Sequence, residues 1–230
     1  TRDQVKELSN KFVALGADKE TIGFSNSRLA YDEIISKFCF AVETHTLKKK
    51  ITSNDISFQY RQAVPFSDEC IEIVDETLRK FMICVSEWKD FKFSFNKATI
   101  FSWFVYIRRN LDSETTDLQN TISYMEFCRA YIKGKYKKVD DKYIKTFLSL
   151  QKQVPFFEVM LNTFNQRTSM GSTDALSIIY RDIIITLFRD MLWNEESELL
   201  QYTMDTFAEV ENFNYTLEKI VEKYNWGENF

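Results

Sequence analysis

A stretch of basic and aromatic side chains between Arg129 and Lys152 has the residue types best suited to binding another molecule. Eight basic residues stand there against two acidic ones, a local balance of +6, and three tyrosines are interleaved: Tyr131, Tyr136 and Tyr143. Basic side chains bind phosphates and tyrosine rings can stack on bases, so this pattern is typical of a nucleic-acid contact. We predict that the contact is made by Lys133, Lys135, Lys137, Lys138 and Lys142. The alternative is a solvated loop between two helices.

The C-terminal part of the chain carries the opposite charge. From Asn194 onward, nine acidic residues stand against Lys219 and Lys223, a local balance of -7. Such a segment either docks on the basic segment or stays solvated as a charged face, and we favour the solvated face. The whole chain has a net charge of -4, which argues against a protein whose entire surface holds nucleic acid.

Side chains that commonly serve catalysis are scarce. His45 is the only histidine, so a histidine-rich zinc centre cannot be assembled, and no Ser or Cys nucleophile signature lies near it. The acidic pairs Asp32 with Glu33 and Asp140 with Asp141 are adjacent in sequence and therefore do not share a helix face. The sequence therefore predicts no catalytic residue, no metal ligand and no cofactor.

A polar loop of small residues runs from Thr168 to Asp174. Its amides could hold an anion at the start of the following helix. The loop lacks the glycine and lysine spacing of a P-loop, so capping of that helix is the interpretation we favour.

The cysteines and the apolar stretches indicate the compartment. The four cysteines form no C-x-x-C pair and lie in apolar runs of helical spacing: Cys39, Cys70, Cys84 and Cys128. We predict buried free thiols in a reducing cytoplasm. No uncharged apolar stretch reaches about 18 residues, and no signal peptide is recognisable, so we expect no membrane association.

Apolar residues recur at three- and four-residue spacing along almost the whole chain, which predicts an all-α fold. Five glycines and two prolines leave few tight turns, which also favours helices. We expect an irregular bundle of about 8–10 helices, with the apolar helix 96–109 buried at its centre. The predicted helices are 2–15, 29–45, 53–64, 67–88, 96–109, 114–133, 140–151, 155–166, 172–193 and 195–224, the last as one or two helices.

Two segments organise the helices into larger parts. Phe91–Phe95 alternates with a period of two, and it is too short for a sheet, so we predict an extended linker whose phenylalanines fill the core. The polar residues 112–114 follow the most apolar helix. They mark a predicted boundary between an N-terminal helical subdomain, 1–111, and a C-terminal helical subdomain, 112–230.

Three segments, taken in order, resemble one protein family. Asn26–Phe38 combines arginine, apolar and acidic residues, Lys97–Phe104 is strongly apolar, and Thr168–Asp174 is a small-residue turn followed by Arg181. This order resembles the helical part of the GmrSD-type restriction endonuclease N-terminal domain family, the ParB/sulfiredoxin-like proteins of bacterial anti-phage defence. The resemblance spans residues 1–192.

The family's catalytic motifs are absent from this sequence. It has neither the Asp-Gly-Gln-Gln-Arg motif nor the Phe-x-x-Ile-Asn segment, and one histidine excludes an HNH partner domain, so no catalytic residue is carried over. The resemblance therefore implies the helical C-terminal portion of such a protein. We expect a non-catalytic module that supports or regulates a nuclease or nucleotide-hydrolysing domain encoded upstream, and the start at Thr1 without Met agrees with this.

A second hypothesis places the chain among interaction proteins without a nucleic-acid role. Its helical surface would then bind a partner protein or a second copy of the chain through an exposed apolar patch of Trp88, Phe93, Phe95 and Trp226. A stand-alone enzyme ranks third, because helices with one histidine and no glycine-rich loop offer few groups for proton or phosphoryl chemistry.

Overall fold

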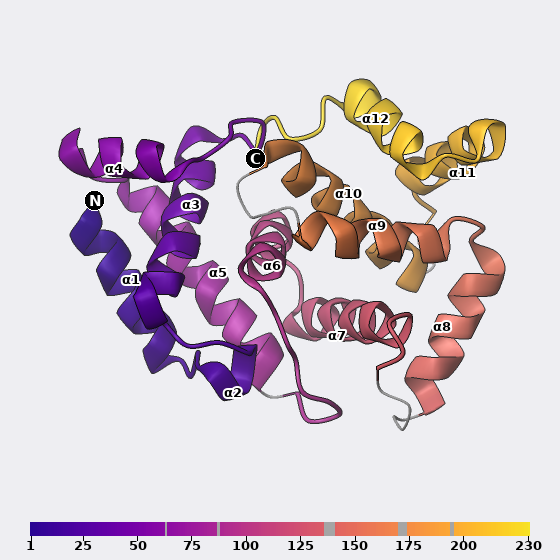
Figure 1. Ribbon diagram of the computed structural model, residues 1–230, viewed down its shortest axis with the longest axis horizontal. Coiled ribbons are helices and arrows are strands. Elements are labelled where there is room, and N and C mark those ends of the chain that lie inside the picture. Colours follow the sequence, from indigo (N-terminus) through magenta and orange to yellow (C-terminus); the bar gives the residue numbers. More distant parts are fainter. Residues whose placement is uncertain (63, 87, 136–140, 170–173, 194–195) are drawn as a thin grey trace.

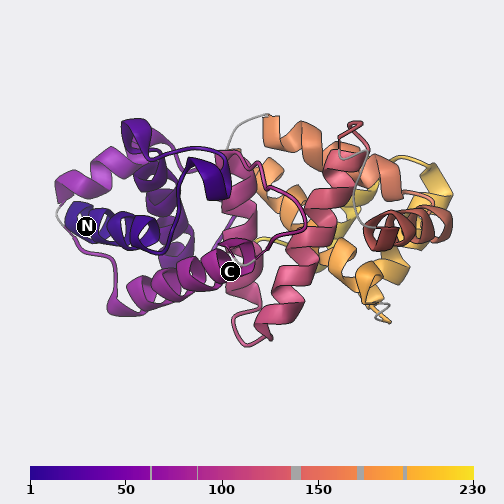
Figure 2. The same ribbon diagram turned by 90° about the horizontal axis from the view of Figure 1, so that it is seen from below.

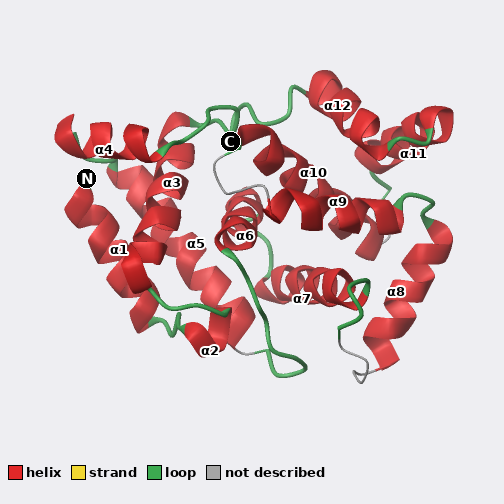
Figure 3. Ribbon diagram, viewed as in Figure 1, coloured by secondary structure: helices red, strands yellow, loops and turns green. Residues whose placement is uncertain are grey.

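The protein folds into α-helices joined by loops. The computed structural model describes residues 1–62, 64–86, 88–135, 141–169, 174–193 and 196–230. Figure 3 shows that these residues contain helices and loops but no named strand, so the predicted all-α class is confirmed. The described residues form twelve α-helices, against the eight to ten expected.

The helix bounds follow the predicted ones closely. The first half contains α1 (Arg2–Ala14), α2 (Lys19–Ile22), α3 (Ala30–Thr44), α4 (Ser53–Gln62), α5 (Asp68–Ser86) and α6 (Lys97–Arg109). The second half contains α7 (Thr115–Tyr131), α8 (Asp141–Gln153), α9 (Phe157–Ser169), α10 (Ala175–Leu192), α11 (Glu198–Val210) and α12 (Phe213–Tyr224). The start of α9 differs, since Pro155 and Phe156 form a turn before it rather than its first residues.

Local capping explains the additional helices. The single turn of α2 is capped by Asp18, whose side chain accepts a hydrogen bond from the Thr21 amide at 2.7 Å. The last predicted segment divides because Glu211 adopts a left-handed φ of 52°. Asn212 then caps α12 by accepting a hydrogen bond from the Tyr215 amide at 3.1 Å.

The helix α6 lies at the centre of the molecule, as predicted. Figures 1 and 2 show α1 to α5 on one side of it and α7 to α12 on the other. Residues 98–107 are all buried, and α6 contacts α3, α5, α9 and α10. Helices also contact one another across residue 112, α5 with α7 and α6 with α10. The two predicted subdomains therefore share contacts, and the boundary at residue 112 stays a prediction.

The linker before α6 inserts its phenylalanines into the core. Phe93 and Phe95 are 4% and 5% exposed, and their rings stack with centroids 5.0 Å apart. This confirms the predicted role of the linker. The hypothesis of an exposed patch is wrong for the same reason, because Phe93 and Phe95 are buried and Trp88 and Trp226 are half-buried against the core.

The cysteines are buried, and none of them forms a disulfide. Burial raises the pKa of the Cys128 thiol, and it raises the pKa of Cys39 as well. Both thiols therefore stay protonated near neutral pH. Among the described residues, no helix is long and apolar enough to span a bilayer.

The residues after α12 contact both halves of the chain. The Phe230 amide donates to the His45 carbonyl at 2.8 Å, and the Trp226 indole donates to Asp182 Oδ2 at 2.7 Å. Arg109 Nε donates to the same Asp182 oxygen at 2.9 Å. Asp182 is 1% exposed, and burial raises its pKa despite the charge of Arg109.

We expect Asp182→Asn to change how stability depends on pH. A carboxyl whose pKa is raised in the folded state binds more protons there than in the unfolded chain. The folded protein therefore loses stability as the pH rises above the ordinary pKa of an aspartate. Relative to Asp182→Asn, the wild type should lose about 1.4 kcal/mol of unfolding free energy per unit of pKa difference. Urea denaturation of both proteins from pH 4 to pH 7 measures this, and a difference that is flat or opposite in sign contradicts the prediction.

Candidate nucleic-acid interface

The end of α7 positions the first two of the predicted lysines. After Tyr131 the chain forms a turn in which the Lys133 and Lys135 amides both donate to the Ala130 carbonyl at 3.1 Å. Gly134 has a left-handed φ of 74°, which allows the chain to reverse at this point. The reversal places Lys133 and Lys135 on the same side of the end of α7.

The two lysines border a small recess between α7, α9 and the linker before α6. Its volume is about 60 Å³, and its lining residues are Phe91, Phe93, Ser94, Glu126, Arg129, Ala130, Lys133, Lys135 and Asn165. A water needs about 10–15 Å³ of such space, whereas sites for drug-sized ligands occupy about 300–1,000 Å³. The recess therefore has the size of a single small anion such as a phosphate group, not of a whole nucleotide.

Arg129 forms the inner wall of the recess and is held on three sides. It is 7% exposed, and its guanidinium donates to Glu126 Oε1 at 2.5 Å and to Asn165 Oδ1 at 3.1 Å. The guanidinium also lies over the Phe164 ring, 4.3 Å from its centroid. A planar cation fixed in this way loses little conformational entropy when it binds an anion.

The lining of the recess has a surplus of positive charge. Among the described residues that line the recess, Arg129, Lys133 and Lys135 stand against one carboxylate, Glu126. No described carboxylate forms an ion pair with Lys133 or Lys135. Burial, followed by the like charges of Arg129 and Lys135, lowers the pKa of Lys133. A bound anion would relieve this repulsion.

A buried arginine adds to the positive charge near Arg129. Arg181 on α10 is 0% exposed, and it donates to Ser102 Oγ at 2.7 Å and to the Arg167 carbonyl at 2.8 Å. Among the described residues it forms no ion pair with a carboxylate, and its Nη2 atom has no hydrogen-bond partner there. Burial, together with the like charge of Arg129, lowers the pKa of Arg181 to about 9. Arg181 is therefore protonated at neutral pH, and its positive charge adds to the charge of Arg129.

The other predicted contact residues do not join this recess. Lys142 forms an ion pair with Asp90 at 2.8 Å and lies over the rings of Trp88 and Tyr143. Lys137 and Lys138 lie outside the described residues. The structure thus brings two of the five predicted lysines together and places Lys142 elsewhere.

The expected base-stacking role of the tyrosines is wrong for Tyr143. Its ring is 0% exposed and packs against Trp88, Phe91 and Phe127, because the apolar face of α8 turns it into the core. Tyr131 is half-buried and stacks on Phe127 with centroids 5.4 Å apart. Tyr136 lies outside the described residues. The interface as described therefore offers phosphate contacts rather than stacking.

The sequence did not indicate that Ser94 and Asn165 would line the recess. Asn165 lies 36 residues from Arg129 and exchanges hydrogen bonds with it in both directions. Ser94 belongs to the linker, which was expected to fill the core. Neither residue carries a local sequence signal, because only helix packing brings them to the end of α7.

The remaining candidates have structural roles in the described residues. Asp174 caps α10 by accepting a hydrogen bond from the Ser177 amide at 2.9 Å, as favoured for the polar loop, whose residues 170–173 lie outside the described residues. Glu33 binds both Lys37 and Lys97 at 2.5 Å. His45 ends α3 with a left-handed φ of 50° and borders a 420 Å³ cavity.

The acidic end does not dock on the basic segment in the described residues. Its ion pairs join Glu198 to Lys223, Glu222 to Lys219 and Glu228 to Lys48. These pairs are partly exposed, which agrees with a solvated charged face.

The fold and the recess define an all-α protein with a small basic recess at the end of α7. Comparison with protein families, curated proteins and solved structures finds no match for this chain. Among the described residues, no group of three or more His, Cys, Asp or Glu side chains is arranged to hold a metal ion.

Proposed function

We propose that this chain is a helical nucleic-acid-binding module that holds a backbone phosphate in the recess at the end of α7. The observation that carries the proposal is the grouping of Arg129, Lys133 and Lys135 around a 60 Å³ space with one carboxylate among its described lining residues. Phosphate contacts supply most of the affinity of non-specific nucleic-acid binding. The buried Tyr143 ring leaves sequence-independent binding as the expected mode.

The salt dependence of binding tests this proposal. Fluorescence anisotropy with a labelled 20-nucleotide single strand should show affinity falling linearly with salt on logarithmic axes between about 0.05 and 0.2 M KCl. Two lysine contacts predict a slope of about -1.4, which is about a sevenfold loss over this range, and a duplex should give a steeper slope.

An oligomer of the same bases on an uncharged peptide backbone is the control. It retains base contacts but has no phosphates, so we expect it not to bind. A flat response below about 0.1 M salt, or equal binding of the uncharged oligomer, contradicts the phosphate contact.

The resemblance to the GmrSD-type family supplies a setting for this binding. A non-catalytic helical module would present nucleic acid to a catalytic domain encoded upstream, and this setting stays a prediction. An Asp-Gly-Gln-Gln-Arg motif in the reading frame upstream of Thr1 would support it, and a start codon immediately before Thr1 would contradict it.

A further inference from the structure

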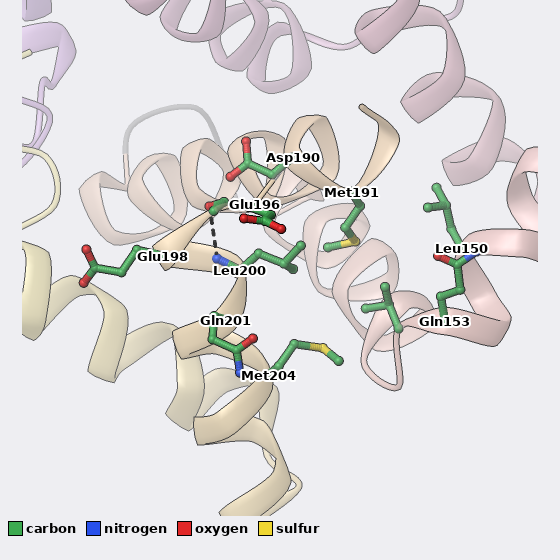
Figure 4. Close-up of a pocket in the computed structure, with 11 residues that line it drawn as sticks. Leu150, Gln153, Asp190, Met191, Glu196, Glu198, Leu200, Gln201 and Met204 are labelled. Carbon is green, nitrogen blue, oxygen red and sulfur yellow. Dashed lines mark hydrogen bonds between the residues drawn. The ribbon is translucent and has the colours of Figure 1, made fainter. Parts of the chain in front are cut away.

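A groove of about 620 Å³ lies where α8, α10 and α11 meet, and the chain's own side chains account for its walls. Figure 4 shows Leu150 and Met191 in these walls, and both belong to the buried core. Two of its three carboxylates, those of Asp190 and Glu198, already form ion pairs with basic residues of α10 and α12. The lining of this groove therefore indicates no ligand.

The 420 Å³ cavity that His45 borders differs in having basic walls. The end of α3 contributes His45, the end of α6 contributes Arg108 and Arg109, and the C-terminal segment contributes Asn229 and Phe230. No aspartate or glutamate is among the described residues that line it. The volume lies within the range of small-molecule sites, about 300–1,000 Å³. This α3–α6 cavity therefore has the size for a small molecule and side chains suited to an anion.

Hydrogen bonds of the C-terminal segment hold the walls of the cavity in place. The Phe230 amide donates to the His45 carbonyl at 2.8 Å, and the Leu47 amide donates to the Gly227 carbonyl at 2.8 Å. Gly227 has a left-handed φ of 97°, and a Cβ atom there would lie 2.9 Å from the Ile179 side chain of α10. Because the segment packs this closely, the cavity is formed before any ligand binds.

Arg109 is already occupied within the protein. Its Nε atom donates to Asp182 Oδ2 at 2.9 Å. Its guanidinium carbon lies 5.8 Å from the centroid of the Trp226 ring and 5.4 Å from the centroid of the Phe230 ring. Arg109 therefore fixes the wall of the cavity, and its charge is largely offset by Asp182.

Arg108 is left without a partner among the described residues. Its side chain is half-buried, its Nε atom is buried without a hydrogen-bond partner, and no described carboxylate forms an ion pair with it. The other buried or half-buried arginines all have described hydrogen-bond partners: Arg129, Arg167, Arg181 and Arg189. Buried polar groups are normally hydrogen-bonded, so the unpaired Arg108 indicates a site for an anion.

Capping of α6 does not account for Arg108. A cation in the last turn of a helix often offsets the partial negative charge of the helix end. Here Asn110 satisfies the last carbonyls instead, because its amide donates to the Ile107 carbonyl at 3.0 Å and its side chain donates to the Tyr106 carbonyl at 2.8 Å. The N–H groups of Arg108 therefore remain available to a ligand.

The donors around the cavity match a phosphate group. Arg108 offers N–H groups in a planar fork, which suits phosphate oxygens. The side chains of His45 and Asn229 are exposed, have no hydrogen-bond partner among the described residues, and each adds a donor from another segment. Three donor groups can bind the three terminal oxygens of a phosphate monoester, whereas a carboxylate has only two oxygens.

We propose that the α3–α6 cavity binds a small hydroxylated molecule through a phosphate monoester, with Arg108 as the main contact. The hydroxylated part is expected because the rest of the lining is mostly polar. This proposal does not rest on nucleic-acid binding, because none of these residues lines the recess at the end of α7.

Isothermal titration calorimetry with glycerol 3-phosphate tests the proposal on the full chain at low salt. Glycerate, which carries a carboxylate on a similar body, and glycerol, which carries no charge, are the control ligands. We expect glycerol 3-phosphate to bind at least about tenfold more tightly than glycerate, and glycerol not to bind. Inorganic phosphate distinguishes a free ion from an ester, and we expect it to bind no more tightly than glycerol 3-phosphate.

Variants of the protein locate the binding. Arg108→Gln should weaken binding of glycerol 3-phosphate at least about tenfold. Arg28→Gln is the matched control, since Arg28 is exposed and precedes α3 at the end opposite to His45, and it should leave binding unchanged. The double variant Lys133→Gln, Lys135→Gln should also leave it unchanged, which separates this cavity from the recess. Circular dichroism verifies that the variants are folded.

His45→Asn keeps the proposal testable if Arg108→Gln does not fold. His45 is exposed, and asparagine tolerates the left-handed φ of 50° at this position. The variant should weaken binding about threefold, as expected for the loss of one hydrogen bond. Equal binding of glycerol 3-phosphate by the wild type, Arg108→Gln and His45→Asn would overturn the proposal. Equal binding of glycerate would overturn it too, and so would tighter binding of inorganic phosphate.

Discussion

We expect the double variant Lys133→Gln, Lys135→Gln to bind a 20-nucleotide single strand about 70-fold more weakly than the wild type at about 0.05 M salt. Each phosphate contact to a single strand contributes about 0.7 logarithmic units of affinity per tenfold dilution of salt. Between 1 M salt, where this contribution vanishes, and about 0.05 M, it amounts to about eightfold per contact. Removing both lysines should also reduce the magnitude of the salt slope by about 1.4. Glutamine keeps most of each side chain's length, so the change isolates the charge.

The matched control is Lys6→Gln, Lys50→Gln. Both lysines are exposed, and neither lines the recess, so this variant changes the net charge of the protein equally. Its affinity should stay within about threefold of the wild type, because charges beyond the Debye length, about 14 Å at 0.05 M salt, are largely screened. Equal losses in both double variants would show that binding follows total charge rather than this recess.

We expect Trp103→Ala to lower the free energy of unfolding by about 3–5 kcal/mol. Trp103 on α6 is 0% exposed, and its removal would leave a cavity in the centre of the core. Its indole also donates to Glu126 Oε1 at 2.8 Å, the oxygen that accepts from Arg129. Urea denaturation followed by circular dichroism measures the loss.

Two further substitutions separate burial from the hydrogen bond. Trp103→Phe keeps an aromatic ring but removes the donor to Glu126, so its own cost should be about one hydrogen bond to a charged group plus a small cavity, less than the cost of Trp103→Ala. Trp193→Ala is the matched control, since Trp193 is 41% exposed, and it should cost about 1 kcal/mol or less. A similar cost for Trp103→Ala and Trp193→Ala would contradict the central position of α6.

The opposite charges of the chain lie in separate regions of the structure. The basic surplus lies at the end of α7, whereas the acidic surplus borders a groove formed with α11. The described ion pairs of the acidic end do not reach the basic segment. A net charge of -4 therefore hides two regions of opposite charge.

The helices themselves could be predicted from the sequence. Apolar spacing, capping residues such as Asn96 and Asp174, and the proline after Val64 act within one or two turns of the chain. The burial of α6 could also be predicted, because a helix that is apolar on all sides has no face to offer to water. The charges of the basic segment and of the acidic end follow from counting their acidic and basic residues.

The candidate sites depended on contacts between distant parts of the chain. The sequence indicated five lysines but not that Lys133 and Lys135 would meet Ser94 and Asn165, or that Lys142 would pair with Asp90. Tyr143 shares the apolar face of α8 with Phe147 and Leu150, and the packing of that face against the core buries its ring.

The sequence by itself determined the all-α class, the central helix, the free cysteines and the two charged regions, because these follow from side-chain type and local spacing. Only the tertiary structure decided which side chains line the recess at the end of α7. The physical reason is that hydrogen bonding within a helix is local, whereas side chains become neighbours across helices only when the whole core packs.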